Sequence, residues 1–258
     1  MALSVAGSDP SGGAGIQADL KTFHAFDVYG AAVLTALTVQ NTRGVRAVHA
    51  VAPDVVLAQL EAVVEDLPVA AAKIGLVPDP AVASALAEWL ARRPLPGLVV
   101  DPVLVAGSGD ALSASGTATA LRALLPSAAL VTPNLDEAAA LVGRPVQTVA
   151  DMTDAARALT DLGAAAALVK GGHLSGDPVD VLVAGGIAQR FAGARVPVRP
   201  THGTGCTLSA AIVAGLAGGF ELAIAVERAT RFVRDALRAA LSLGGGARPL
   251  DHRVRPEG

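Results

Sequence analysis

Short apolar runs alternate along the chain with longer segments in which apolar positions recur every three or four residues. The runs of strand length are residues 2–7, 31–39, 70–76, 97–101, 129–132, 166–170, 179–184 and 187–191. The helical patterns cover residues 14–26, 53–67, 79–93, 115–125, 135–142, 150–162, 207–217 and 221–240. Strands that alternate with helices of this length predict βαβ units and a mostly parallel sheet that is covered on both faces.

The two strand-like runs at 179–184 and 187–191 follow one another without a helix between them. They therefore predict an antiparallel edge to the sheet. In open α/β sheets, ligands gather at the carboxyl ends of the strands. The segments in which we expect the chemistry are residues 7–15, 40–41, 74–76, 101–103, 132–137 and 170–173.

The segment 201–207, Thr-His-Gly-Thr-Gly-Cys-Thr, stands directly before a predicted helix. A helix N-terminus leaves backbone N–H groups unpaired and carries partial positive charge, so it suits a phosphate or a developing oxyanion. The alternative is a capped helix with Thr204 or Thr207 as the N-cap. Cys206, the one cysteine of the chain, favours the phosphate-handling interpretation, because we expect the helix dipole to favour its thiolate.

Composition narrows the function to small-molecule chemistry. The 258 residues are 52% hydrophobic and 17% charged, so the chain can bury a full core, and we expect a single domain over 1–258. The net charge of −3 and the scattered arginines predict no basic surface that would bind nucleic acid or an anionic membrane. The uncharged stretch 200–220 is half polar and predicts a core helix rather than a membrane span. The N-terminus has no secretion signal, so we expect a cytoplasmic protein.

The glycine-rich loop 7–15 has the polar atoms and small residues of a substrate-facing loop. It lacks the Gly-Lys-Ser/Thr ending of a phosphate-binding Walker A loop, and no acidic residue follows where a dinucleotide ribose would need one. Asp19 lies on the helix after this loop. From spacing alone it is either a substrate-facing group or an ordinary solvated helix charge.

Polar groups also follow three of the later strands. Asp101 ends one strand, and Asn134 and Glu137 open a helix after another, so their oxygens suit Mg²⁺ bound to phosphates, directly or through water. Asn134 fits an N-cap equally well, and Glu137 a favourable first-turn charge. Lys170 is a charge on an apolar strand and needs a partner, for which phosphate is the candidate. His173 is expected to be structural or adjacent to the substrate, since its spacing indicates no zinc site.

Taken together, these motifs resemble the ribokinase superfamily and, within it, the hydroxymethylpyrimidine/phosphomethylpyrimidine kinases of thiamine biosynthesis. The matching segments are residues 6–22, 40–42, 73–75, 101–103, 132–134, 170–173 and 201–207, in the family's order. The resemblance implies a ribokinase-like three-layer α/β/α sandwich with a mostly parallel central sheet, and a cytoplasmic homodimer. It also implies a kinase that uses ATP and Mg²⁺ to phosphorylate the alcohol of 4-amino-5-hydroxymethyl-2-methylpyrimidine and then the resulting phosphate.

The resemblance also implies roles for individual residues. The substrate pyrimidine is expected beside Gly7, Asp19, Gln40, Leu76 and Val103. ATP and its phosphates are expected at Lys170, Thr132, Asn134 and Thr201, and the metal at Asp101 and Glu137. Catalysis is expected at Gly203, Thr204, Gly205 and Cys206, where backbone N–H groups stabilise the transferring phosphoryl group and the Cys206 side chain receives the proton of the alcohol. Leu76 stands where many relatives have methionine, and the loop at 105–108 lacks the lysine or threonine often found there.

Three other functions compete with this one. A pyridoxal or pyridoxine kinase of the same cysteine-bearing branch is the nearest, and Gln40 favours the pyrimidine because a carboxamide offers a donor and an acceptor to an aminopyrimidine edge. A regulatory nucleotide-binding module is disfavoured by the full set of acidic, lysine and Gly-Thr-Gly-Cys residues. A dinucleotide-dependent oxidoreductase is disfavoured by the missing fingerprint.

Overall fold

The computed structural model describes residues 1–105, 110, 112–172, 174–197 and 201–256. Most of the strands join one sheet of nine, and two further short strands pair with each other. The nine strands are β1 (Ala2–Ser8), β2 (Gly30–Asn41), β3 (Gly44–Ala50), β4 (Ala71–Ile74), β5 (Val99–Val100), β6 (Leu130–Val131), β7 (Ala166–Val169), β8 (Val179–Ala184) and β9 (Ile187–Ala192). Their order across the sheet is β3-β2-β1-β4-β5-β6-β7-β8-β9. The pairs from β2 to β7 are parallel, whereas β3, β8 and β9 are antiparallel to their neighbours.

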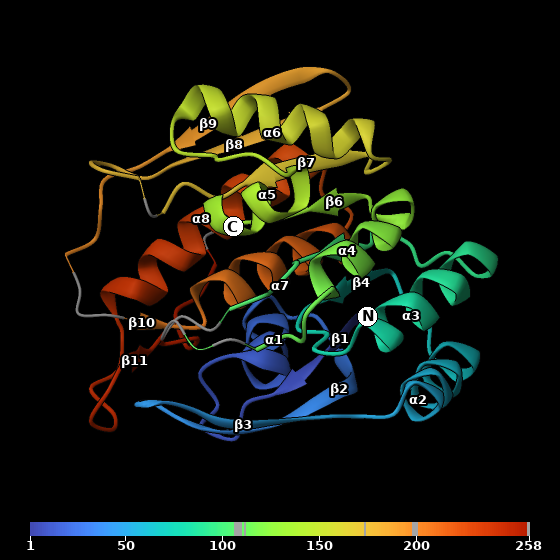
Figure 1. Cartoon of the computed structure of the whole chain (residues 1–258). Coiled ribbons are helices and arrows are strands. Elements are labelled where there is room, and N and C mark those ends of the chain that lie inside the picture. Colours follow the sequence, from blue (N-terminus) through green and yellow to red (C-terminus); the bar gives the residue numbers. More distant parts are fainter. Residues whose placement is uncertain (106–109, 111, 173, 198–200, 257–258) are drawn as a thin grey trace.

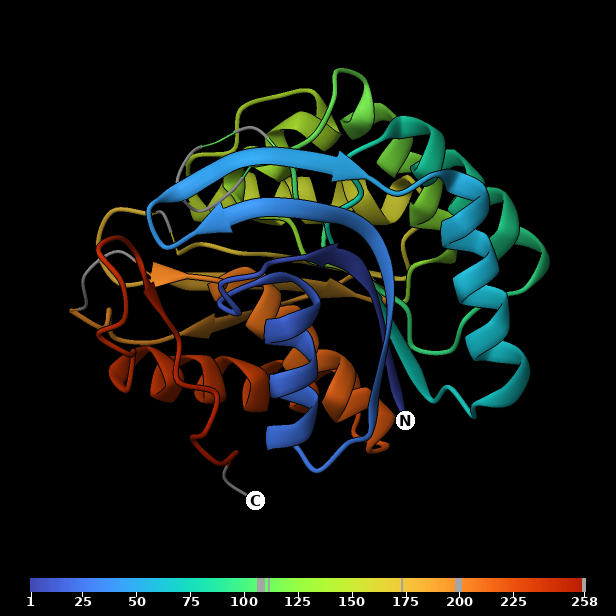
Figure 2. The same ribbon diagram turned by 90° about the horizontal axis from the view of Figure 1, so that it is seen from below.

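Helices cover both faces of this sheet (Figure 1). They are α1 (Gly15–Ala25), α2 (Pro53–Asp66), α3 (Pro80–Arg92), α4 (Thr117–Leu121), the 3₁₀ helix η1 (Arg122–Ser127), α5 (Leu135–Val142), α6 (Val149–Asp161), α7 (Thr204–Ala217) and α8 (Leu222–Arg238). Helices α1, α7 and α8 pack together on one face, as Figure 2 shows from below, and the others pack on the opposite face. The predicted α/β/α sandwich with an antiparallel edge is confirmed.

Helix α7 is the central helix of its layer because it contacts β1, β4 and β5 below it and α1 and α8 on either side. This position explains its composition, since small residues let neighbouring backbones approach closely. A Cβ atom on Gly215 would lie 3.0 Å from the Cβ of Ala225 in α8. In the described part of the chain, none of the helices is both long and apolar enough to cross a membrane.

Five differences from the expected elements concern the site. Strand β2 continues to Asn41 and is followed by a strand, β3, that was not predicted. Helix α7 begins at Thr204 rather than at residue 207, and the helix expected at 115–125 is split into α4 and η1. The short strands β10 (Thr201–His202) and β11 (Arg248–Pro249) were also missed. His173 and residues 106–108 of the loop noted above lie outside the described residues.

Candidate active site

A cavity of about 870 Å³ opens where the carboxyl ends of the central strands meet the N-terminus of α7. Most of the side chains and loops expected at the site line it: Gly7, Gln40, Leu76, Val103, Asp101, Asn134, Glu137, Lys170, Thr201, Gly203, Thr204, Gly205 and Cys206. Asp19 and Thr132, both in the described chain, are not among the lining residues. These two lie behind the wall and act on residues that face the cavity.

The N-terminus of α7 is left uncapped by side chains. Its N-cap residue is Gly203, at φ 85°, so the expected alternative of Thr204 or Thr207 as the cap is wrong. The Thr207 hydroxyl instead donates to the Gly203 carbonyl inside the first turn. The first N–H groups of the helix therefore have no intrahelical acceptor and face the cavity, which suits an anion.

Two glycines let this turn lie close to other parts of the site. A Cβ atom on Gly203 would fall within 1.8 Å of the Gly13 carbonyl oxygen in the first loop. One on Gly205 would lie 3.2 Å from the Lys170 Nζ atom. A side chain is excluded at Gly203, and one at Gly205 would require Lys170 to shift, so the turn, the first loop and Lys170 share one compact wall.

Lys170 brings the positive charge to this wall. Its Nζ atom lies 2.8 Å from Asp101 Oδ1 and 3.8 Å from Glu137 Oε2. Burial alone would lower the pKa of Lys170, but the two carboxylates raise it well above its usual value. The lysine is therefore always charged, as a phosphate-binding group must be.

Asp101 is the carboxylate that anchors Lys170. Burial would raise its pKa, but Lys170 and Lys73 outweigh that effect and lower it, so the group stays ionised. Its Oδ1 atom also accepts from the Thr132 hydroxyl at 3.1 Å, and its Oδ2 atom accepts from Ser209 in α7 at 2.9 Å. Thr132 thus supports Asp101 from within the protein.

Glu137 combines a structural role with a place on the cavity wall, although its side chain is largely buried. It forms a capping box with Asn134, in which the Asn134 N–H donates to Glu137 Oε2 at 2.7 Å and the Glu137 N–H donates to Asn134 Oδ1 at 2.9 Å. The expected N-cap role of Asn134 is confirmed. Burial raises the pKa of Glu137 to about 7, against the opposing effect of Lys170. The carboxyl is poised to ionise fully when a cation approaches.

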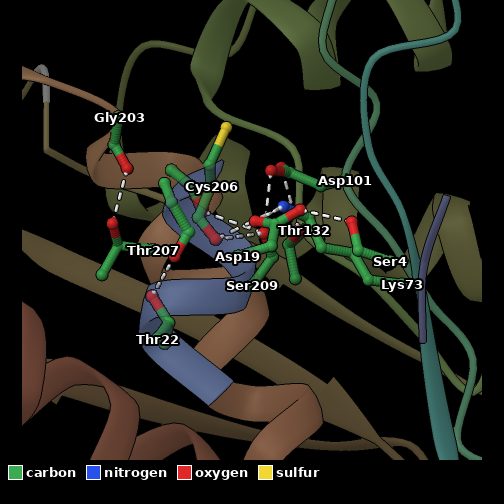
Figure 3. Close-up of polar contacts among 12 residues, drawn as sticks. Ser4, Asp19, Thr22, Lys73, Asp101, Thr132, Gly203, Cys206, Thr207 and Ser209 are labelled. Carbon is green, nitrogen blue, oxygen red and sulfur yellow. Dashed lines mark hydrogen bonds and ion pairs between the residues drawn. The ribbon is translucent and has the colours of Figure 1, made fainter. Parts of the chain in front are cut away.

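Lys73 is one of the residues at the site that the sequence analysis left without a role. It is fully buried on β4, and its ammonium lies 2.5 Å from Asp19 Oδ1 and 3.3 Å from the Cys206 carbonyl oxygen (Figure 3). Asp19 Oδ2 accepts from Ser4 on β1. The interpretation of Asp19 as a solvated helix charge is wrong, since its side chain is fully buried. This cluster ties α1, β1 and β4 to the first turn of α7.

The Cys206 sulfur points away from the Lys73–Asp19 pair in Figure 3, on the cavity side of the helix. Burial raises the pKa of the thiol, and the attraction of Lys73 and a hydrogen bond from the Gly15 N–H do not offset this. The expectation that the helix dipole favours the thiolate is therefore wrong in its net direction. In the free protein Cys206 is a neutral thiol at neutral pH.

A second network joins the first loop to the turn before α7. His202 Nε2 lies 2.9 Å from Asp9 Oδ2 and 2.7 Å from the Gln40 carboxamide. Asp9 and His202 also line the cavity. The sequence analysis had placed Asp9 and His202 in ligand-facing segments without giving either a role. Their pairing spans 193 residues, and spacing alone carries no signal of it.

His252 supports the same turn from the C-terminal segment. Its Nε2 atom lies 2.9 Å from the Thr207 hydroxyl, and burial, helped by Lys21, lowers the pKa of His252 to about 4. Since an unfolded histidine titrates near pH 6.5, the folded state resists protonation between these values, and stability falls as the pH drops through this window. We expect wild-type protein to lose about 2 kcal/mol more than His252→Gln on going from pH 7 to pH 5.

Urea denaturation at the two pH values measures this difference. The variant controls for all other groups that titrate between pH 7 and pH 5, because only His252 differs between the two proteins. Equal losses in both proteins would show that His252 is not buried as the neutral form.

The amino-acid sequence is similar to that of known kinases. A family model described as phosphomethylpyrimidine kinase matches residues 9–251. A hydroxymethylpyrimidine/phosphomethylpyrimidine kinase of Rhizobium meliloti (strain 1021) is 51% identical, covering 98% of this chain and 96% of the relative. A protein of the same name from Escherichia coli (strain K12) is 45% identical, with 97% and 96% covered.

Solved structures are similar over the same length. The ADP complex of Bacillus subtilis pyridoxal kinase has a TM-score of 0.89 at 37% identity, covering 97% of this chain and 96% of that one. A phosphomethylpyrimidine kinase from Clostridium difficile 630 has a TM-score of 0.81 at 41% identity, with 91% and 98% covered.

Proposed function

The chain therefore belongs to the phosphomethylpyrimidine kinase family, and on this premise we propose that it transfers phosphoryl groups from ATP to 4-amino-5-hydroxymethyl-2-methylpyrimidine in thiamine biosynthesis. The first transfer gives the monophosphate and the second the diphosphate. The ribokinase-like fold is confirmed by the matches to solved kinases. The observation that carries the proposal is one cavity holding an uncapped helix N-terminus, a charged lysine and a carboxamide.

The residues divide the work of phosphoryl transfer between positioning and charge stabilisation. Such reactions pass through a loose transition state with charge spread over the phosphoryl oxygens. The N–H groups of Gly203, Thr204 and Gly205 stabilise that charge from the helix end, and Lys170 stabilises it from the strand side. Thr201 and Asn134, which also line the cavity, bind the nucleotide phosphates. The complex of Staphylococcus aureus pyridoxal kinase with AMP-PCP and pyridoxal supports ATP as the donor.

Mg²⁺ fits the acidic side of the cavity through Glu137. The described residues hold no cluster of three acidic, histidine or cysteine side chains arranged around one point. Asp101 has its oxygens engaged by Lys170, Thr132 and Ser209, so it would act on the ion through water. Glu137 faces the cavity and would hold the ion together with the phosphates of ATP. The bound ion would neutralise charge on the phosphate oxygens.

Cys206 lies at the end of the helix where the alcohol is to be placed. Because its thiol is neutral in the free protein, we infer that the backbone N–H groups and Lys170 provide most of the rate enhancement. The proton of the alcohol leaves late in a loose transition state, which asks little of a base. As the neutral thiol, Cys206 shapes the site; it would take up the proton of the alcohol only after its own proton has passed to solvent.

The proposal is tested by the products. Mass spectrometry of a reaction containing the pyrimidine alcohol, ATP and Mg²⁺ is expected to detect both the monophosphate and the diphosphate. Monophosphate alone, with added monophosphate left unchanged, would reduce the activity to a single step. The absence of any product would refute the proposal.

A pyridoxal or pyridoxine kinase is the second candidate, and the high structural similarity to pyridoxal kinases favours it. Gln40 separates the two. We expect Gln40→Met to shift the ratio of kcat/KM for the pyrimidine alcohol over pyridoxine by roughly ten- to a hundredfold, because a buried hydrogen bond is lost with one ring only. Steady-state kinetics with both alcohols measures the shift. The control is Gln189→Met on the exposed strand β9, and an equal loss for both rings would make Gln40 structural.

We further propose that the protein is a homodimer in the cytoplasm. Light scattering after size-exclusion chromatography measures the mass of the particle and so tests the dimer. The proposal rests on the resemblance to the family. A mass equal to one chain would contradict it.

A further inference from the structure

Two groups compete for the same nitrogen of His202. Asp9 Oδ2 and the Gln40 carboxamide lie 2.9 Å and 2.7 Å from Nε2, both within hydrogen-bond distance. A single ring nitrogen either carries a hydrogen and donates, or is bare and accepts. The two contacts therefore cannot be satisfied independently of each other.

Asp9 decides which state the nitrogen adopts. Its Oδ1 atom accepts from the Ser11 N–H at 2.9 Å and the Ser11 hydroxyl at 2.7 Å. Its Oδ2 atom accepts from the Gly13 and Ala14 N–H groups at 3.1 Å and 2.8 Å. Burial would raise the pKa of Asp9, but the hydrogen bonds from His202 and Ser11 outweigh it and lower the pKa to about 2. Asp9 is an ionised acceptor, so the hydrogen shared with it must lie on His202 Nε2.

The hydrogen on His202 also sets the orientation of Gln40. In the structure the Gln40 NH₂ nitrogen is the atom that lies 2.7 Å from His202 Nε2, and a hydrogen on Nε2 would set a donor against a donor there. Turning the carboxamide about its terminal bond exchanges the two ends at no steric cost, because they are nearly the same size. The oxygen then accepts from His202, and the NH₂ group faces the cavity.

We propose that His202, held by Asp9, is a positioning residue that fixes the Gln40 carboxamide with its NH₂ group toward the substrate. The site then selects a ring that presents an unprotonated nitrogen, or another hydrogen-bond acceptor, at that point. This specificity deepens the proposed function and rests on it. A pyrimidine ring nitrogen is such an acceptor.

The backbone beside Gln40 and the backbone beside His202 both hold the contact between these two side chains in place. The pairing of β2 with β3 shifts register between Val39 and Gln40, and a bulge of this kind re-aims the side chain beside it. On the other side, a Cβ atom on Gly13 would lie 2.8 Å from His202 Cδ2. A glycine at that position is therefore needed for the ring to approach Asp9.

Nitrogen NMR tests the first half of the proposal without any reaction. In full-length protein labelled with ¹⁵N-histidine, with His202→Gln used to assign the signal among the five histidines, we expect His202 Nε2 to carry a hydrogen. A bare Nε2 atom would overturn the proposal. The result is independent of which substrate the enzyme phosphorylates, so it separates a failure of this inference from a failure of the proposed function.

Kinetics of Gln40→Glu test the second half. A glutamate still accepts from His202 but presents an oxygen to the cavity in place of the NH₂ group. We expect KM for the pyrimidine alcohol to rise at least roughly tenfold, as for Gln40→Met, because the donor is lost. An unchanged KM would mean that an oxygen already faces the substrate, and would overturn the proposal.

His202→Phe and Gly13→Ala remove the support while leaving Gln40 in place. We expect both to raise KM for the pyrimidine alcohol roughly tenfold and to change KM for ATP little, with His49→Phe on the exposed face of β3 as the control. A loss in kcat with KM for the alcohol unchanged would assign His202 to phosphoryl transfer and overturn its role toward Gln40.

Discussion

Lys73→Met is expected to lower the free energy of unfolding by about 3–5 kcal/mol, because it leaves the Asp19 carboxylate without its partner in the protein interior. Both side chains of the pair are fully buried, so no water replaces the lost ammonium. Burial already raises the pKa of Asp19 despite the attraction of Lys73. Urea denaturation followed by circular dichroism measures the loss.

A double variant separates the unpaired charge from the loss of packing. In Lys73→Met combined with Asp19→Asn, we expect the loss to be smaller than the sum of the single losses by about 1–3 kcal/mol. Lys21→Met is the control for removing a lysine, since Lys21 is exposed and donates to the Gly12 carbonyl. Additive losses in the double variant would show that the pair does not interact as the structure indicates.

Gly203→Ala is expected to lower kcat by at least about 10²–10³-fold, the effect of losing one donor to a developing oxyanion. The new methyl group would fall on the Gly13 carbonyl oxygen, so the turn must move, and the first N–H groups of α7 move with it. Coupled assays of ADP release at saturating substrate measure kcat.

Gly116→Ala is the matched control for this change. Gly116 has nearly the same backbone conformation, φ 87° against 85°, and also precedes a helix, but a Cβ atom there would meet nothing within 4 Å. Both variants bear the strain of a left-handed alanine, and only one disturbs the site. A comparable loss of kcat in both would mean that backbone strain, rather than the position of the turn, is responsible.

The elements that the hydrophobic pattern predicted are those that lie in the middle of the fold. Strands β4 and β7 are buried over their whole length; the apolar run of β7 is uninterrupted, and that of β4 is broken by Lys73 alone. Strand β3 was missed because it is half exposed at the edge of the sheet and carries Arg46 and His49 among its apolar residues. The register shift beside Gln40 also breaks the alternation there.

A role in the site could be predicted where it depends on residues within one segment of the sequence. It could not be predicted where it depends on contact between two distant segments. The helix N-terminus at 203–206 could be predicted from the seven consecutive residues 201–207. The burial of Asp19 depends on Lys73, which lies 54 residues away, and the role of His202 depends on Asp9. The thiol pKa was misjudged for the same reason, since burial in the fold outweighs the local helix dipole.

The pairing of Asp9 with His202 and of Thr207 with His252 has a consequence for the chain during its synthesis. The first of these residues leaves the ribosome long before the last, so the cavity stays unfinished until nearly the whole polypeptide has emerged. A chain that ends before β10 lacks His202 and the N-terminus of α7, and so lacks this part of the cavity. Truncated products would thus lack groups proposed for phosphoryl transfer, and catalytic activity would report on completed translation.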